Sequence, residues 1–355
     1  MARLLIKNGR VWDGDRFLNA DVLVEEDTVA AIEPQLTDDT AYLYDASGKI
    51  VSAGLVDDHV HLRVLPSDPF GIQAEMSCFP FGVTAAADAG RTEGNPAVLD
   101  SFMLKNVVFV VAPIVGDRVD LQQLDKHIAH FGDRAVGVKV YFDNRDGEVL
   151  TVAPLAAVAA FAKQRGLRVM VHSSYSPAPM ADILNVLNPG DILTHAFHGG
   201  KNHAAVDNFE SMKRAQQRGV CIDAGLAGHV HTDFAVFRQA IQAGLLPDII
   251  STDITKFSAY TRGGRYGMTM CMSIARHLGM SEEDIFKAVT TTPAAALGKS
   301  AEWGSLKVGA PADIAVLEYT DEGFSLTDEA GNHVEDPRGY RCVLTVSDGQ
   351  IVYKY

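Results

Sequence analysis

The sequence predicts an α/β protein in which a TIM-like (β/α)8 barrel is joined to a small β-sandwich domain built from both termini. Two observations support this fold class. Short β-branched runs alternate with amphipathic helical stretches through the middle of the chain. Segments that look like matching hairpins stand at the two ends. We expect residues 1–52 and 304–355 to form the β domain and residues 53–303 to form the barrel.

The end segments share one pattern of strand, turn and strand. Near the start, LLIKNGRVWDG predicts a strand, a turn at Asn8-Gly9 and a second strand. Near the end, CVLTVSDGQIVYKY repeats the pattern around Asp348-Gly349. The runs DVLVEEDTVAAIEP and PADIAVLEY add further short strands. A single domain assembled from both ends accounts for this likeness, and two unrelated edge hairpins are the alternative.

The middle of the chain predicts a parallel sheet. Its strand-like runs are LVDDHVHL, GVTAAADAG, VVFVVAPI, AVGVKVYF, LRVMVHSS, DILTHAF, GVCIDAG and DIISTDI. Between them, APLAAVAAFAKQRG and NFESMKRAQQRG predict helices that close on a glycine after basic residues. Strands of this number over about 250 residues fit a closed barrel. A doubly wound open sheet is the alternative, although no G-x-G-x-x-G turn supports it.

Composition and charge exclude several classes of protein. The 355 residues are 47% hydrophobic and 21% charged, as in ordinary globular proteins. A net charge of −14 argues against nucleic-acid and anionic-membrane surfaces, which require clustered lysine and arginine. We find no signal-peptide core, no membrane-length apolar run and no C-x-x-C pair among the four cysteines. We expect a cytoplasmic homo-oligomer that acts on a small molecule.

Side chains able to bind metal follow the apolar part of five predicted strands. Residues two apart in a strand point to the same face, so His59 and His61 form one pair. The carboxyl ends of barrel strands form the active-site rim, where these side chains should meet. Imidazole and carboxylate suit zinc and neighbouring ions. A structural role is the alternative for each histidine. The predicted set is His59, His61, Lys139, His172, His195 and Asp253.

Lys139 is the unusual member of this set, because a buried ammonium is costly. Reaction with CO₂ would convert its amine to a carbamate, which is a carboxylate on a long stem and can bridge two cations. A lysine paired with Asp253 or Asp143 is the alternative.

These segments, with TTTPAAALGKSAEWGSLKVGAPADIAVLE near the end, resemble the amidohydrolase superfamily over nearly the whole chain. The resemblance is greatest to the binuclear branch with a carboxylated lysine, which includes dihydroorotases, hydantoinases and isoaspartyl dipeptidases. Within that branch, DILTHAFHG and GVTAAADAG are similar to a group of amidohydrolase/deacetylase metallohydrolases.

The resemblance implies two divalent ions, with zinc as the expected metal. One ion would be bound by His59, His61 and Asp253, and the other by His172 and His195. Carboxylated Lys139 and a hydroxide would bridge them. Asp253 would be the catalytic residue, which takes the hydroxide proton and passes it to the leaving group of an amide or ester.

Four residues are candidate substrate contacts. Arg63 matches a dihydroorotase arginine that holds a substrate carboxylate, and Arg91 ends the second predicted strand. An ordinary salt bridge is the alternative for Arg63. His229 and His231 lie in GLAGHVHTDF after the seventh strand.

Two segments depart from the dihydroorotase pattern. TDITKFSAYTRGG replaces Asp-x-Ala-Pro-His after the eighth strand, and DAGRTEG replaces Pro-Asn-Thr after the second. They argue against a pyrimidine ring and favour a deacetylase-like enzyme for small acyl carboxylic acids. A cyclic amidohydrolase of the dihydroorotase or hydantoinase type is the alternative. A deaminase would need an H-x-x-E segment, which is absent, and a non-catalytic homologue would have lost metal ligands.

Overall fold

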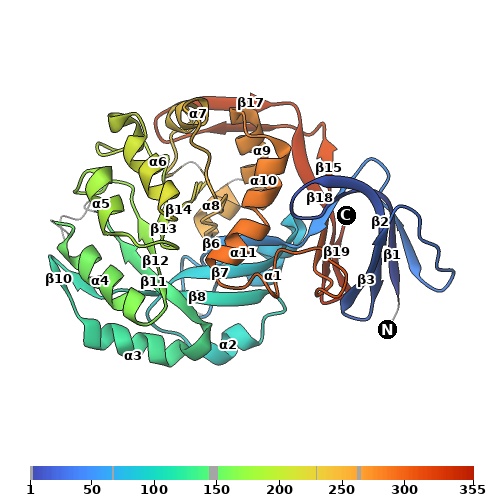
Figure 1. The fold of residues 1–355 in the computed structure, drawn as a ribbon, viewed down its shortest axis with the longest axis horizontal. Helices are drawn as coiled ribbons and strands as arrows, with labels where there is room; N and C mark the ends of the chain where they lie inside the picture. Colours follow the sequence, from blue (N-terminus) through green and yellow to red (C-terminus); the bar gives the residue numbers. More distant parts are fainter. Residues whose placement is uncertain (1–2, 66–67, 144–150, 229, 262–264) are drawn as a thin grey trace.

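The computed structural model contains two large sheets and describes residues 3–65, 68–143, 151–228, 230–261 and 265–355. The first sheet is parallel and curls around the middle of the molecule (Figure 1). Seven of the eight predicted barrel strands form it, in sequential order. Their burial is nearly complete, as expected for parallel strands covered on both faces. The strands are β6 (Leu55–Val60), β7 (Val83–Arg91), β8 (Lys105–Val111), β11 (Ala135–Tyr141), β12 (Arg168–His172), β13 (Ile192–Thr194) and β14 (Cys221–Ile222).

Segment 249–254, which is part of the eighth predicted strand DIISTDI (248–254), lies between the two edges of the curled sheet. Ile249 forms a parallel bridge with Asp223, just after β14, and Ile254 forms one with Val60 of β6. Backbone hydrogen bonds add to these bridges, including Asp253 N–H to the His59 carbonyl at 2.8 Å. These contacts fix the carboxyl end of β6, which contains His59, beside Asp253.

Helices cover the outer side of the curled sheet (Figure 1). The two helices predicted from their glycine endings are present as α4 and α6, and Gly166 and Gly219 follow them with φ of +67° and +93°. The helices are α1 (Ala74–Cys78), α2 (Pro96–Asp100), α3 (Leu121–Phe131), α4 (Ala153–Gln164), α5 (Met180–Val186), α6 (Glu210–Gln217), α7 (Phe234–Gln242), α8 (Lys256–Thr261), α9 (Met268–Leu278), α10 (Glu282–Ala288) and α11 (Thr291–Ala296), with 3-10 turns η1 (Phe79–Phe81), η2 (Gly132–Arg134) and η3 (Ala204–Asp207).

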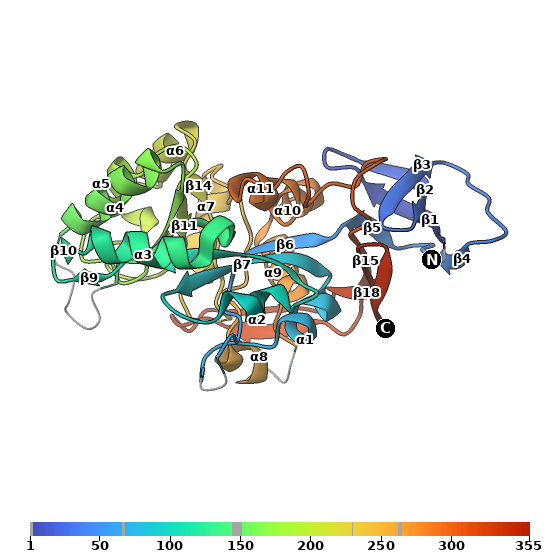
Figure 2. The same ribbon diagram turned by 90° about the horizontal axis from the view of Figure 1, so that it is seen from below.

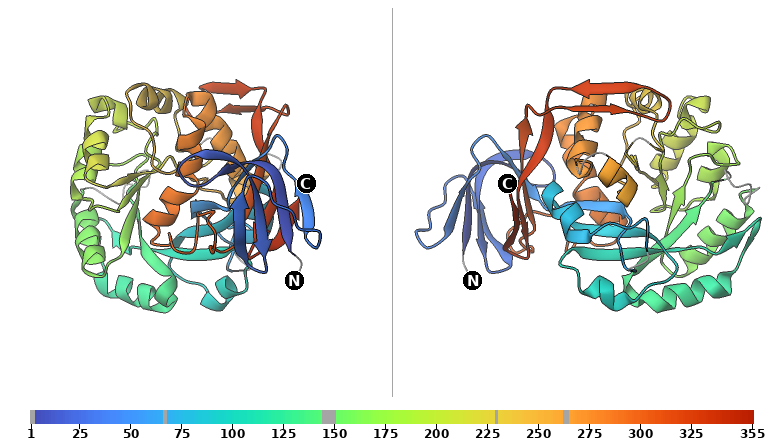
Figure 3. Two further views of the ribbon diagram at one scale, coloured as in Figure 1. Left: turned by 45° about the vertical axis from the view of Figure 1, so that its right-hand side comes forward. Right: turned by 180° about the vertical axis from the view of Figure 1, so that it is seen from behind.

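The second sheet is built from both ends of the chain, as predicted, and lies at one end of the molecule (Figure 2). Antiparallel pairing of β5 with β15 joins the two halves. Both chain ends lie on this part (Figure 3). Its order is β19-β18-β15-β5-β1-β2-β3, with β4 beside β1. The strands are β1 (Leu4–Trp12), β2 (Phe17–Glu25), β3 (Thr28–Glu33), β4 (Tyr42–Asp45), β5 (Ile50–Ala53), β15 (Ile314–Thr320), β18 (Gly339–Ser347) and β19 (Gln350–Lys354).

One of the two predicted end turns is wrong. Asp348 and Gly349 do connect β18 to β19, with φ of +45° and +71°. Asn8 and Gly9, in contrast, lie inside the continuous strand β1, where the pairing with β2 shifts register. Asn8 has φ of +61°, so the pair forms a bulge rather than a turn.

Two small hairpins complete the described structure. One pairs β9 (Ile114–Val115) with β10 (Arg118–Val119). The other pairs β16 (Phe324–Thr327) with β17 (His333–Asp336) and extends from the second sheet to the start of α7 (Figure 1). Within the described ranges, no helix is long and apolar enough to cross a membrane.

Candidate metal centre

The structure brings His59, His61 and Asp253 together at the end of β6. All three side chains are buried, and their ligand atoms lie within 4.8 Å of one another. The Nε2 atoms of His59 and His61 lie 3.3 Å and 2.9 Å from the same Asp253 oxygen, Oδ1. The bridge of Ile254 to Val60 sets this register.

The donor set around Asp253 fits a divalent cation. Oδ1 is buried and forms no hydrogen bond of normal geometry with the described residues, although two imidazole nitrogens face it. A buried carboxylate oxygen without such a bond is costly unless a cation occupies its coordination sphere. Two imidazoles and one carboxylate are ligands typical of zinc.

A second group contains the other two predicted histidine ligands. His172 ends β12 and His195 follows β13, and their ring centroids are 4.5 Å apart. His231 joins them, with ligand atoms of all three rings within 4.8 Å. The two groups are adjacent, because Nε2 of His195 lies 3.7 Å from Oδ2 of Asp253.

Lys139 lies beside His59 of the first group and is completely buried. Its amine nitrogen is 3.0 Å from Nε2 of His59 and 3.3 Å from the sulfur of Met170, and both of these groups are uncharged. Burial lowers the pKa of Lys139 to about 8, against the attraction of Asp253 and Asp223. About a tenth of the amine is therefore unprotonated one pH unit below this pKa, far more than for an ordinary lysine.

A network of buried polar groups beneath the first group holds the rings. The hydroxyl of Thr194 lies 3.0 Å from Nδ1 of His59 and donates a 2.6 Å hydrogen bond to Asp223. Ser251 also donates to Asp223, at 2.8 Å. Asp57 accepts a 2.6 Å bond from the hydroxyl of Thr252. Partners of this kind orient metal-binding imidazoles.

Sequence reasoning did not assign roles to Thr194, Ser251 or Asp223. Asp223 had one available signal, because it is a carboxylate that directly follows the seventh apolar strand. The two hydroxyl residues carried no such signal, since serine and threonine are common at strand ends.

Electrostatics favour neutral His59, His172 and His195 and an ionised Asp253. Burial lowers the pKa of His59 and His195 well below the ordinary value, and it also lowers that of His172. Burial acts to raise the pKa of Asp253, but His59 and His61 outweigh it and hold this pKa well below its usual range. Neutral imidazole and ionised carboxylate are the metal-binding forms.

The predicted substrate contacts lie in different surroundings. Arg63 is exposed, and its backbone pairs with Ile72. Arg91 is 9% exposed, with Nε 2.6 Å from Asp88 and a terminal nitrogen 3.3 Å from Asp68. His231 lies with His172 and His195, as described above, and His229 lies outside the described residues.

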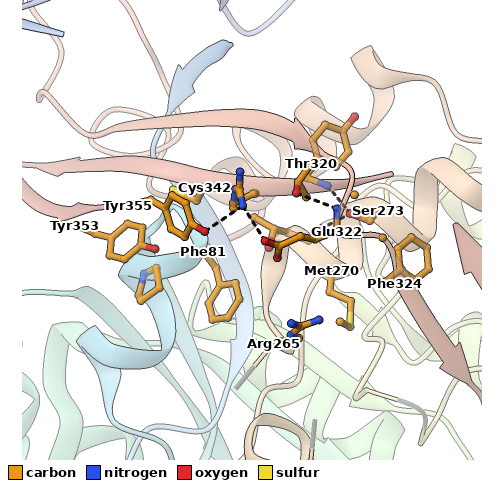
Figure 4. Close-up of a pocket in the computed structure, with 16 residues that line it drawn as sticks. Phe81, Arg265, Met270, Ser273, Thr320, Glu322, Phe324, Cys342, Tyr353 and Tyr355 are labelled. Atoms are coloured by element: carbon orange, nitrogen blue, oxygen red, sulfur yellow. Dashed lines mark hydrogen bonds and ion pairs between the residues drawn. The ribbon is translucent and has the colours of Figure 1, made fainter. Parts of the chain in front are cut away.

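A separate cavity of about 250 Å³ lies where α9 meets β15 and β18 (Figure 4). Aromatic side chains, including Phe81 and Phe324, form part of its wall. Arg341 at its edge lies 3.3 Å from Glu322 and 3.2 Å from the hydroxyl of Tyr355. None of the six predicted metal ligands lines this cavity, which is therefore distinct from the candidate centre.

Comparison with known proteins agrees with this geometry. A deacetylase of Enterococcus faecalis is 28% identical over 375 residues, which cover 98% of each chain. Two solved structures have a TM-score of 0.85. One is a dihydroorotase, 22% identical over 100% of this chain and 98% of its own, and the other is an adenine deaminase, 25% identical over 100% of both. Residues 115–353 match the amidohydrolase family, which is about two thirds of the sequence. The chain is therefore a hydrolytic enzyme and belongs to the amidohydrolase family.

Proposed function

We propose that the enzyme is a deacetylase-like hydrolase that uses two divalent ions, with zinc as the expected metal. It would cleave the amide or ester bond of a small acyl carboxylic acid. The observation that carries this proposal is the convergence of His59, His61 and Asp253 beside His172 and His195. The name of the Enterococcus faecalis relative supports the same reaction class. Bound ions would polarise the scissile carbonyl and lower the pKa of a water molecule.

Asp253 is the proposed catalytic proton carrier. Its carboxylate faces both ligand groups, with Oδ1 toward His59 and His61 and Oδ2 toward His195. The lowered pKa keeps the carboxylate ionised, and in the proposed reaction it would take up the proton that the attacking water loses. From that position it can transfer the proton to the departing nitrogen or oxygen of the substrate.

Lys139 is proposed to carry a carbamate. The unprotonated amine attacks the carbon of CO₂; a new N–C bond forms as one C=O π bond breaks and its electron pair moves to oxygen, and the nitrogen loses one proton to solvent. The product would be an anionic carbamate on the lysine side chain. The complete burial of Lys139, its lowered pKa and its uncharged contacts support this modification.

Arg63 and Arg91 are proposed to favour a substrate that has a carboxylate beside the scissile bond. Arg63 is exposed, whereas Arg91 is buried and its guanidinium contacts Asp88 and Asp68. Arg91 would contact the substrate carboxylate while its guanidinium remains paired with Asp88 and Asp68. We retain His229 and His231, which follow the seventh predicted strand in the sequence, as candidate substrate contacts.

We further propose that segment 249–254 is the eighth strand of a (β/α)8 barrel that spans residues 53–303. Its bridges to Asp223 and Val60 support this closure. Residues 1–52 and 304–355 would form the second domain, for which a β-sandwich is the expected form. A cytoplasmic location and a homo-oligomeric state belong to the same proposal.

The test is a substrate screen on zinc-loaded enzyme. It compares N-acetyl amino acids and O-acetyl hydroxy acids with neutral acetate esters, dihydroorotate, a hydantoin and adenine. We expect the acyl acids to give the highest kcat/KM. Arg63→Met should raise KM for the acyl acids far more than for neutral esters, since a charge-assisted contact is lost. A higher kcat/KM for dihydroorotate or the hydantoin would favour the cyclic-amide alternative, and turnover of adenine would favour a deaminase.

A further inference from the structure

His172, His195 and His231 form a compact cluster of imidazoles. The ring centroids are 4.5 Å apart for His172 and His195, 4.7 Å for His172 and His231, and 4.5 Å for His195 and His231. One ligand atom from each ring lies within 4.8 Å of the others. The loop position of His231 suggested a substrate contact. Its ring, however, lies about as close to His172 and to His195 as these two predicted ligands lie to each other.

Each ring of the cluster is held through one nitrogen. The hydroxyl of Ser174 lies 3.1 Å from Nε2 of His172 and 2.9 Å from Nδ1 of His231. Nδ1 of His195 lies 2.7 Å from the carbonyl of Gly225. Fixing one nitrogen of an imidazole to a hydroxyl or carbonyl is how proteins orient histidines that bind metal.

The backbone at His231 shares a feature with two of the predicted ligands. His231 has φ of +69°, while His195 has +57° and Asp253 has +46°. Residues with a Cβ rarely adopt this left-handed conformation, and those that do are found in turns and clustered at functional sites.

The loop that carries His231 is anchored by the β16–β17 hairpin. The carboxylate of Asp328 accepts a 2.7 Å bond from the N–H of Phe234. The amide of Asn332 donates to Asp233 at 3.0 Å and to Asp328 at 2.9 Å. The N–H of Asp233 also donates to the carbonyl of Phe197 at 2.9 Å. These bonds hold the loop at Asp233, two residues after His231.

We infer that His231 is a third protein ligand of the second ion, together with His172 and His195. The inference rests on the proposed two-ion function. Three imidazoles and one open position form a complete zinc site without the carbamate. The second ion should therefore bind even when Lys139 cannot be carboxylated, whereas a site of two histidines would depend on the bridge.

The experiment measures metal binding directly. Metal-stripped wild type, Lys139→Ala and Lys139→Ala/His231→Ala are titrated with Zn²⁺ against a chromophoric chelator, and with Co²⁺ while the visible spectrum is recorded. We expect Lys139→Ala to retain the second ion, at His172, His195 and His231, as well as an ion at His59, His61 and Asp253, since each group has three ligands. The added His231→Ala change should weaken only the second ion, by more than about 100-fold, beyond the 10–100-fold typical of losing an outer partner. The Co²⁺ spectrum should change shape as one nitrogen ligand is lost.

Lys139→Ala/His203→Ala is the matched control, since His203 lies outside the cluster and caps η3. It should bind the second ion as Lys139→Ala does. Thermal unfolding of the metal-free variants checks that each is folded. Equal Zn²⁺ affinity of Lys139→Ala and Lys139→Ala/His231→Ala would overturn the inference. Binding of two ions by the wild type would still support the proposed function in that case. Failure of the wild type to bind any ion would instead overturn the proposed function.

Discussion

The hydroxyl of Thr194 donates a 2.6 Å hydrogen bond to the buried carboxylate of Asp223. The same hydroxyl lies 3.0 Å from Nδ1 of His59, so it connects a buried charge to an imidazole of the candidate centre. This contact leaves Nε2 as the His59 atom that faces Asp253. The affinity of the first ion should therefore depend on a residue that does not touch it.

Thr194→Val tests this dependence. The valine keeps the shape of the side chain but removes the hydroxyl, so His59 loses its orienting partner. We expect Zn²⁺ affinity at the first group to fall about 10–100-fold. Chelator competition measures the change, and Thr194→Ser is the control because it restores a hydroxyl. Unchanged affinity in Thr194→Val would show that the ring is held by packing alone.

Asp253→Asn separates metal binding from proton transfer. The amide oxygen can still act as a ligand, but the side chain can no longer accept and release a proton. We expect kcat to fall about 10²–10⁴-fold while at least one ion remains bound. Steady-state kinetics and elemental analysis on one preparation check both parts. His59→Ala, in comparison, should lose the first ion. Near-normal turnover in Asp253→Asn would remove Asp253 from its proposed catalytic role.

Carboxylation of Lys139 should depend on pH in a defined direction. Burial lowers the pKa of Lys139 from 10.5 to about 8, and only the unprotonated amine reacts with CO₂. At a constant bicarbonate concentration, carbamate in the metal-free protein should therefore increase as pH rises through about 8 and level off above it. Carbon-13 NMR with labelled bicarbonate measures the signal. Lys139→Arg should show none, and a wild-type signal that persists in this variant belongs to another amine.

Gly225 is predicted to tolerate no side chain. A Cβ there would lie 2.4 Å from the Thr194 hydroxyl and 2.8 Å from Nδ1 of His195, at φ of +49°. We expect Gly225→Ala to displace His195, to weaken the second ion and to lower stability by about 1–3 kcal/mol through overpacking. Elemental analysis and thermal unfolding of the metal-free protein measure these effects.

Gly244→Ala is the control for this prediction. Gly244 also has positive φ, +78°, but a Cβ there would meet nothing within 4 Å. It shares the backbone strain of Gly225→Ala without the steric clash. Equal losses of stability and of the second ion in the two variants would mean that strain, not contact with His195, causes them.

The sequence was most informative where secondary structure repeats. A strand alternates its side chains with a fixed period, so the residues at strand ends, such as His59, His172 and His195, could be predicted to meet. The sheet register then brings Asp253 beside His59. Periodicity says nothing about loops. The place of His231 follows from the path of a loop held by Asp328 and by the hairpin that contains it, which no local pattern records.

Asn8-Gly9 shows a second limit. The pair is a strong local signal for a hairpin turn, yet it forms a bulge within β1. The reason lies in the neighbouring strand, because a Cβ at Gly9 would lie 2.5 Å from a methyl group of Val51. Here the glycine is required by close approach of β5, a contact that only the folded chain reveals.

The pairing of β5 with β15 has a consequence for how the protein is made. Strands β1 to β5 leave the ribosome first, but the strands that extend their sheet, β15, β18 and β19, are synthesised only after the whole curled sheet. Until then β5 presents an open edge, and such edges are prone to pair with other chains. The curled sheet in the middle of the chain can fold before β15 is synthesised, since its strands pair in sequential order. During synthesis, therefore, β5 is among the last strands to complete its pairing although it is made early, and aggregation should begin at its edge when translation is interrupted.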